Sequence, residues 1–306
     1  MGTYIIRPAE RASAKPLIGL YSESGCGKTM SALLLAKGFV DDMGKVVMIE
    51  TESGRGEIFA DDSTVGGYQV LSLRDNFSPM EYGKAIDAVN KSGAQALIVD
   101  SASHEWEGVG GVLSMAADNE AAGKKGQSVW QRPKIDHQTY FMLRLMQTPI
   151  PLVIVCMRAK YPMEQVVIDG KKEWQRSKKL APKQSDDILF EMMVHGWVDD
   201  DHKWHATKYS KEEFKQIFVD KQRIDVDTGA RLAEWAKGIV PAIDEVMSAA
   251  ILTDLTTRIK KADTLDKLQF IGNEFNKQHK KAMTEEDKAV TMKAYQEKKT
   301  ALTTGA

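Results

Sequence analysis

The sequence has little cysteine and no long apolar run. It contains only two cysteines, Cys26 and Cys156, too few for a disulfide framework, which predicts a reducing compartment. The longest apolar stretch, residues 150–157, is far shorter than the ~20 residues that a membrane-spanning helix needs. The first residues contain no apolar segment of the kind that a secretion signal requires. We therefore expect a cytoplasmic protein without a membrane partner.

An excess of charge of one sign is also absent. The 42 lysines and arginines are balanced by 43 aspartates and glutamates, so any affinity for a polyanion must come from local basic patches. Hydrophobic residues make up 42% of the chain and charged residues 28%. These values exclude a disordered, collagen-like or disulfide-dense protein. A length of 306 residues fits two domains, or one large domain with an appendage.

Short apolar runs alternate with helical patterns along much of the chain. Runs rich in valine and isoleucine have the length of strands buried on both faces, at residues 16–21, 45–50, 94–100 and 151–157. Helical patterns at 30–40 and 80–90 separate some of them, which predicts an α/β fold with a mainly parallel sheet. Two more strand-like runs, 190–198 and 202–209, flank three aspartates and predict a hairpin at the edge of the sheet.

The pattern divides the chain into three parts. Residues 1–14 contain a short β-like run and a polar linker, residues 15–227 form the α/β core, and residues 228–306 form a small helical module. Thr264 and Thr284 are predicted helix N-caps in that module. The N-terminal strand pairs either with its own sheet or with the sheet of a second copy. The second option predicts a homo-oligomer.

The first predicted strand leads into Ser-Glu-Ser-Gly-Cys-Gly-Lys-Thr at residues 22–29, and a helical pattern follows. This is the P-loop pattern, except that Ser22 replaces its first glycine and is expected to cause some strain. Backbone N–H groups of such a loop bind phosphate oxygens, its lysine contacts the β- and γ-phosphates, and its threonine joins the Mg²⁺ shell. A plain strand-to-helix connection is the alternative. The pattern predicts a site for ATP and Mg²⁺ made by Ser22, Glu23, Ser24, Gly25, Cys26, Gly27, Lys28, Thr29 and Met30.

Acidic residues at other strand ends are expected to complete this site. Asp100 ends the third apolar run and is predicted to hold Mg²⁺ with Thr29, directly or through water. Hydrolysis also needs a carboxylate that orients or activates water. Glu52 follows the second apolar run and Glu105 lies five residues beyond Asp100, so both are candidates for catalysis beside Lys28. Either one is alternatively a solvated loop carboxylate.

The order of these motifs resembles that of a RecA-type ATPase core: the P-loop, then residues 49–52, 99–101 and 156–160. More narrowly, residues 99–108 and 155–160 resemble phage-encoded RecA-like ATP-binding proteins, some of which are single-strand annealing recombination proteins. The resemblance covers about residues 15–215. It implies a RecA-like P-loop NTPase that binds and hydrolyses ATP and acts on single-stranded DNA in the host cytoplasm. RecA-like ATPases place the catalytic carboxylate on the strand next to the P-loop strand, which favours Glu52 over Glu105.

The resemblance also implies two DNA-contacting loops, at about residues 107–130 and 160–183. The second contains seven positive and three negative side chains, a local charge of +4, with Tyr161 and Trp174 among them. Cations that neutralise phosphates and aromatic rings that stack on bases suit a single-strand binder. A solvated surface loop is the alternative. The predicted DNA-binding residues are Lys124, Lys125, Lys160, Lys171, Lys172, Trp174, Arg176, Lys178 and Lys179.

Two further cations are assigned to the nucleotide site. Arg158, at the end of a core strand, either senses the γ-phosphate or is a surface arginine. Lys208, in the edge hairpin, either reaches nucleotide bound to a neighbouring subunit, as in RecA-like filaments, or guards the sheet edge against strand pairing.

Two other functions stay open. One is a nucleotide-loaded adaptor with negligible turnover, whose helical tail recruits a partner such as a single-strand-binding protein. The other is a P-loop kinase that acts on a small molecule.

Overall fold

The structure is a computed structural model that describes residues 15–168, 171–237, 242–276 and 285–304. It divides into two compact units, residues 15–235 and the described residues from Ala236 onward. The predicted N-terminal strand and linker, residues 1–14, lie outside the described residues. The expected boundary at residue 227 falls inside helix α9 (Val226–Lys237).

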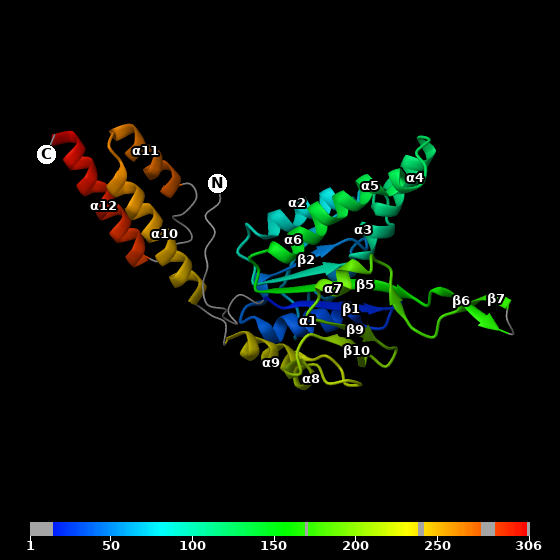
Figure 1. Ribbon diagram of the computed structural model, residues 1–306. Helices are drawn as coiled ribbons and strands as arrows, with labels where there is room; N and C mark the ends of the chain where they lie inside the picture. Colours follow the sequence, from blue (N-terminus) through cyan, green and yellow to red (C-terminus); the bar gives the residue numbers. More distant parts are fainter. Residues whose placement is uncertain (1–14, 169–170, 238–241, 277–284, 305–306) are drawn as a thin grey trace. The chain divides into compact units, whose positions relative to one another are not determined.

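The first unit is an α/β structure with a mostly parallel central sheet, as predicted (Figure 1). Its strand order is β10-β9-β1-β5-β4-β2-β3, and β8 pairs with β5 beside this path. Among the described strands of this central sheet, the β9–β10 and β5–β8 pairs are antiparallel and the others are parallel, so the predicted edge hairpin is confirmed. The strands are β1 (Leu17–Ser22), β2 (Val46–Glu50), β3 (Gln69–Ser72), β4 (Ala96–Asp100), β5 (Leu152–Lys160), β8 (Ala181–Pro182), β9 (Val194–Val198) and β10 (Trp204–Tyr209).

Helices cover both faces of this sheet (Figure 1), which is why its central strands are apolar at successive positions. Side chains alternate between the two faces. In β1, Ile18 and Leu20 belong to one core cluster and Leu17 and Tyr21 to the other. The first cluster includes residues of α1 (Lys28–Phe39), α8 (Glu213–Ile217) and α9. The second includes residues of α2 (Pro79–Val89), the π-helix η4 (His137–Met142), α6 (Leu143–Gln147) and α7 (Asp187–Glu191).

The structure differs from the sequence-based expectation in three segments. Strand β3 was not expected, because two of its four residues are exposed and two are only partly buried, so the apolar signal is weak. The segment 160–183, expected as a loop, contains an antiparallel hairpin of β6 (Met163–Ile168) and β7 (Lys171–Arg176). The segment 107–130, also expected as a loop, contains α4 (Val112–Ala121) and the start of α5 (Gln127–Asp136). Polar residues in these segments mask the strand and helix periodicities.

The second unit contains three described helices, α10 (Ala242–Lys261), α11 (Leu265–Glu274) and α12 (Glu285–Thr304). Leu255, Ile259, Leu268 and Ile271 contribute to its core. The predicted N-cap is confirmed for α11, since the Thr264 hydroxyl accepts the N–H of the third helical residue at 3.3 Å. The other predicted cap, Thr284, lies outside the described residues. Within the described ranges, no helix is both long and apolar enough to span a membrane.

The contact between α1 and α9 generates the first prediction. A Cβ atom on Gly38 would overlap the carbonyl oxygen of Val226 and lie 2.8 Å from the Cα of Gly229. Overpacking of this kind costs about 1–3 kcal/mol or more. We therefore expect Gly38→Ala to lower the free energy of unfolding by at least that amount in urea titrations. The control Lys37→Ala, at a half-exposed neighbouring position, should change it by less than about 0.5 kcal/mol. Equal stability of Gly38→Ala and wild type would contradict this packing.

Candidate functional site

The carboxyl ends of the central parallel strands meet at one edge of the sheet. The register pairs Ser22 of β1 with Arg158 of β5, and Glu50 of β2 with Asp100 of β4. A cavity of about 320 Å³ lies at this edge. Its lining comes from the loop after β1, the start of α1, the segment after β2, and the ends of β4 and β5: Ser24, Gly25, Gly27, Lys28, Thr29, Met30, Glu52, Arg55, Ile58, Phe59, Asp100 and Arg158.

The loop at residues 22–27 turns sharply between β1 and α1. Gly25 and Gly27 both adopt φ of +90°, a conformation that favours glycine. The loop therefore presents the first amides of α1, the positive end of the helix, to the cavity. The Lys28 ammonium lies over the loop, 3.1 Å from both the Ser22 hydroxyl and the Glu23 carbonyl oxygen. Ser22 ends β1 and is not among the residues with positive φ, so the expected strain at this position is not seen.

Thr29 and Asp100 lie in direct contact. The Thr29 hydroxyl donates a hydrogen bond of 2.5 Å to Oδ2 of Asp100, which is only 5% exposed. Burial raises the pKa of the Asp100 carboxyl to about 6, although the hydrogen bond from Thr29 opposes this shift. Hydroxyl and carboxylate oxygens are ligands that Mg²⁺ prefers, and Mg²⁺ is usually held by one or two carboxylates together with substrate phosphates. The described residues contain no group of three or more His, Cys, Asp or Glu side chains able to hold a metal. A cation at Thr29 and Asp100 would therefore need further oxygens from a bound molecule.

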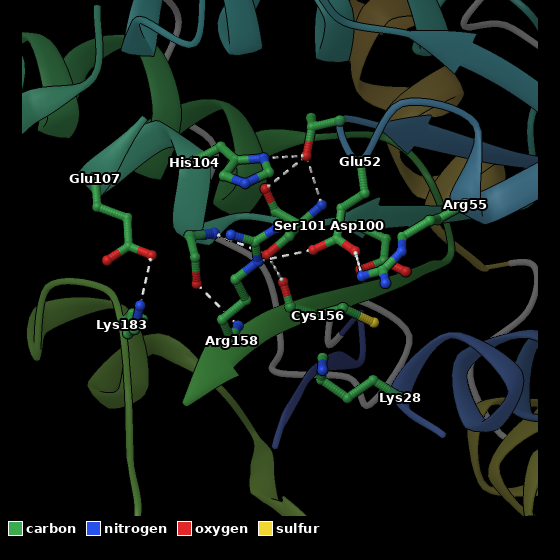
Figure 2. Close-up of polar contacts among 12 residues, drawn as sticks. Lys28, Glu52, Arg55, Asp100, Ser101, His104, Glu107, Cys156, Arg158 and Lys183 are labelled. Atoms are coloured by element: carbon green, nitrogen blue, oxygen red, sulfur yellow. Dashed lines mark hydrogen bonds and ion pairs between the residues drawn. The ribbon is translucent and has the colours of Figure 1, made fainter. Parts of the chain in front are cut away.

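Glu52 faces two arginines across the cavity (Figure 2). Its carboxylate accepts a hydrogen bond of 2.9 Å from Nε of Arg158 and lies 3.5 Å from the Arg55 guanidinium. Burial alone would raise the pKa of Glu52, but the hydrogen bond from Arg158 and the positive charges of Arg158 and Lys28 hold it below its ordinary value. Glu52 is therefore an ionised carboxylate beside the loop.

Strand β2 is not next to β1, because β5 and β4 lie between them. The expectation that Glu52 follows a strand adjacent to β1 is therefore wrong. Glu52 reaches the cavity through the segment after β2, and the fully buried Glu50 shapes that segment. The Glu50 carboxylate accepts the backbone N–H groups of Glu52 and Gly54, at 2.6 and 3.1 Å, and pairs with Arg74 at 2.6 Å. This role was not foreseen from the sequence, although an acidic residue at the end of an apolar strand was a signal for it.

Glu105 does not line this cavity. Its carboxylate is fully buried and lies 3.0 Å from both Nδ1 of His137 and Nε2 of Gln184. Of the two carboxylates considered for catalysis, only Glu52 borders the cavity beside Lys28 and Thr29.

Two side chains of the β9–β10 hairpin have contacts that bear on the site. The Lys208 ammonium donates to the carbonyl oxygens of Leu189 and Phe190, at 3.3 and 2.7 Å, in helix α7. It does not line the cavity, and its contact with a neighbouring subunit stays a prediction. Nδ1 of His202 lies 2.9 Å from the carbonyl oxygen of Cys26. This link between the hairpin turn and the loop was not foreseen from the sequence.

The basic residues of segment 160–183 lie on the β6–β7 hairpin or beside it. Lys160, Lys172, Trp174, Arg176, Lys178 and Lys179 are all exposed, and Lys171 is the first residue of β7. Lys124 and Lys125 are exposed between α4 and α5. The structure thus divides the predicted DNA-binding residues between two surface elements.

The two faces of the β6–β7 hairpin differ in charge. Directly opposite residues of an antiparallel pair share a face. The register therefore puts Lys172, Trp174 and Arg176 on one face, opposite Val167, Gln165 and Met163. The other face contains Glu164 and Glu173, together with Lys171, which pairs with Ile168. The Arg176 guanidinium lies 4.7 Å from the centre of the Tyr161 ring. One face thus combines two cations with exposed Trp174, whereas the other contains two carboxylates and one lysine, so the predicted DNA-binding residue Lys171 is not on the Trp174 face.

A scan against models of known protein families finds none that matches this chain, and a search of curated proteins likewise finds no match. We therefore infer the function of this chain from the residues and geometry of the cavity and the hairpin.

Asp100 generates a pH-dependent prediction. Because its pKa is about 6 in the folded protein and lower in the unfolded chain, the folded state binds the proton more tightly. This group therefore destabilises the fold progressively as pH rises from about 4 to 6, and fully above that range. In buffer with a chelator, Asp100→Asn should be more stable than wild type by about 1–3 kcal/mol at pH 7.5, with the difference vanishing near pH 4. Urea titrations at both pH values measure this. Lower stability of the variant at pH 7.5 would contradict the assignment.

Proposed function

We propose that this chain is a Mg²⁺-dependent RecA-like ATPase that acts on single-stranded DNA, of the type that phages use in recombination. The 2.5 Å contact between Thr29 and Asp100, beside the glycine-containing loop, carries the proposal. In P-loop NTPases a threonine or serine of the loop and a strand-end aspartate hold the Mg²⁺ of the bound nucleotide. The pairing of two such residues, far apart in sequence, supports the P-loop reading over a plain turn.

Several of the lining residues would have a role in this function. The loop amides and the Lys28 ammonium would bind the phosphates, with Lys28 exchanging the Ser22 and Glu23 oxygens for phosphate oxygens. Thr29 and Asp100 would hold Mg²⁺, whose charge neutralises the transferring phosphoryl group. Glu52 would orient the attacking water once phosphate competes for Arg158. The exposed apolar side chain of Ile58, at the rim, offers a surface for an uncharged part of the nucleotide.

Strand β5 connects the cavity to the hairpin. Arg158 contacts Glu52 in the cavity, and β5 continues from it to Lys160 and the hairpin. The segment that follows β7 also contacts this strand, because the Lys183 N–H donates to the Arg158 carbonyl oxygen at 2.7 Å and β8 pairs with β5. A change in the partner of Arg158 would therefore affect both segments that connect the hairpin to β5. The bound nucleotide would in this way change the affinity of the protein for DNA. Identical DNA affinity with ATP, ADP and no nucleotide would contradict this coupling.

ATP hydrolysis with and without single-stranded DNA tests the proposal. We expect Mg²⁺-dependent hydrolysis that DNA stimulates and that Lys28→Ala abolishes. Glu52→Gln should lower the turnover number by about 10²- to 10⁴-fold while ATP affinity stays nearly unchanged, because the amide cannot accept a proton from water. Glu57→Gln, an exposed carboxylate in the neighbouring helix η3 (Arg55–Phe59), is the matched control and should retain activity. Full activity of Lys28→Ala would contradict the assigned site.

One observation favours the adaptor with negligible turnover as a second candidate. Glu52 is already paired with Arg158 and lies near Arg55, and a carboxylate held in this way is a poor base until the pair opens. Tight ATP binding with no measurable hydrolysis, in the presence and absence of DNA, would select the adaptor over the ATPase.

The charge difference between the hairpin faces generates a further prediction. Trp174→Ala should weaken binding of a single-stranded oligonucleotide by about tenfold, since a stacked base contributes ~1–3 kcal/mol. Lys172→Ala and Arg176→Ala should weaken it and reduce its dependence on salt. Glu164→Gln and Glu173→Gln, on the opposite face, are the controls and should not weaken binding. Fluorescence anisotropy at several salt concentrations measures these effects. Losses as large in the glutamine variants as in the alanine variants would contradict binding by the Trp174 face.

A further inference from the structure

A second cavity, of about 640 Å³, lies in the same unit. Its lining residues belong to α3 (Ser103–Glu107), to α5 and the start of η4, and to the segment that leads from β8 into α7. It shares no lining residue with the cavity at residues 22–29. Its lining residues are Trp106, Trp130, Lys134, His137, Gln138, Gln184, Ser185, Asp186 and Asp187.

Two indole rings form the apolar part of this cavity. Trp130 and Lys134 are four residues apart and therefore share a face of α5, which also continues into His137. Trp106 comes from α3, and its ring meets that of His137 edge to face at a centroid distance of 5.4 Å. Both indoles are only half-buried. Two partly accessible indoles in one cavity provide flat surfaces on which another ring can stack.

The buried part of the lining contains an unsatisfied polar atom. His137 is 2% exposed, and its Nδ1 lies 3.0 Å from the Glu105 carboxylate. Its other ring nitrogen, Nε2, is buried and has no hydrogen-bond partner among the described residues. Leaving such an atom without a partner is costly, so His137 is an unsatisfied polar group in the wall of this cavity. His137 also begins the π-helix η4, a helix type that is frequent at functional sites.

The same network fixes the position of His137. Nε2 of Gln184 donates to Glu105 at 3.0 Å and to the carbonyl oxygen of Ala102 at 2.9 Å. Glu105 therefore has a structural role, because its buried carboxylate accepts the hydrogen bond from Gln184 and holds His137, a lining residue of the second cavity.

The charges and polar groups indicate the class of ligand. One cation, Lys134, is set against Asp186 and Asp187, so the lining has no positive excess for a phosphate group. The Gln138 amide donates to the Asp187 carboxylate at 3.4 Å, and these groups offer both donors and acceptors at the rim. Flat apolar surfaces with mixed donors and acceptors are what recognises an unstacked nucleobase.

We infer that this cavity binds a nucleobase against the indoles of Trp106 and Trp130, with the polar edge of the base toward His137 and Gln138. The base belongs either to a single strand or to a free nucleoside, since both present the same ring. The inference goes beyond the proposed function, because it requires neither ATP binding nor hydrolysis.

Fluorine NMR of the full chain labelled with 5-fluorotryptophan tests this inference. Trp106→Phe and Trp130→Phe assign the two signals. The probes are deoxyadenosine, thymidine, a mixed-sequence single-stranded oligonucleotide, and an abasic oligonucleotide of the same length. We expect a base-containing probe to shift the Trp106 and Trp130 signals and the abasic strand to leave them unchanged. Shifts with the oligonucleotide alone identify a base within a strand, and shifts with the nucleosides alone identify a free ligand.

The inference is overturned if neither nucleosides nor the oligonucleotide shift these two signals. Separate anisotropy measurements show whether the strand binds at all. A strand that binds without moving either signal would overturn the nucleobase site and leave the proposed DNA binding intact. If nucleosides shift the signals but the strand does not bind, the nucleobase site is supported and the proposed DNA binding is contradicted.

Affinities provide a second readout. Where the strand supplies the base, Trp130→Leu should weaken binding of the base-containing oligonucleotide about tenfold and leave binding of the abasic strand unchanged. Where a free nucleoside is the ligand, the loss should be seen with deoxyadenosine or thymidine. Gln131→Ala, an exposed neighbour outside the cavity lining, is the control and should bind like wild type. Unchanged affinity of Trp130→Leu for every probe would overturn the inference, and the labelled wild type decides the question if that variant does not fold.

Discussion

The parallel register of the central sheet is the constraint on which the site depends. Four strands, β1, β2, β4 and β5, run in the same direction and end at one edge. Residues far apart in sequence thereby meet within one cavity, and Thr29 at the start of α1 contacts Asp100 at the end of β4. A one-residue slip of a strand would turn each of its side chains to the other face. The two core clusters, which divide the β1 side chains between them, therefore also fix the positions of the polar strand ends.

The cavity contains both positive and negative side chains, and a charged ligand can take the place of one partner in its ion pairs. Lys28, Arg55 and Arg158 are set against Glu52 and Asp100. The Arg158 side chain is 40% exposed in its pair with Glu52, and exposed pairs of this kind contribute only ~0–1 kcal/mol. A phosphate group, with more charge, would compete for Arg158 at little cost. In the proposed function, a phosphate that binds Arg158 would break this weak ion pair and free Glu52. The new contact of Arg158 would also make β5 sensitive to bound nucleotide.

The fold class and most of the cavity lining could be predicted from the sequence, because local patterns determine both. Buried parallel strands are apolar at successive positions, and the glycine-containing loop is a contiguous motif that ends in Lys28 and Thr29. Contacts between side chains far apart in the sequence were harder to predict. The sequence left Glu52 and Glu105 as alternatives, and only the contacts of the Glu105 carboxylate with His137 of η4 and with Gln184 show that it does not face the cavity.

Other features depended on three-dimensional register. The hairpin at 163–176 alternates apolar and charged residues too irregularly to be predicted as strands, and the separation of Glu164 and Glu173 from Trp174 appears only in the pairing. The role of Glu50 arises from backbone N–H groups that its carboxylate accepts; the sequence shows an acidic residue at a strand end but not which backbone groups it binds. Trp106 and Trp130 lie apart in the sequence and line one cavity because α3 and α5 border it together.

The most direct measurement is a crystal structure of the chain with Mg²⁺ and a non-hydrolysable ATP analogue. The account predicts the γ-phosphate beside Lys28, the metal about 2.1 Å from the Thr29 hydroxyl oxygen with Asp100 in its shell, and a phosphate oxygen in place of Glu52 at Arg158. Nucleotide bound elsewhere, or phosphates in the loop with the metal away from Thr29 and Asp100, would contradict it.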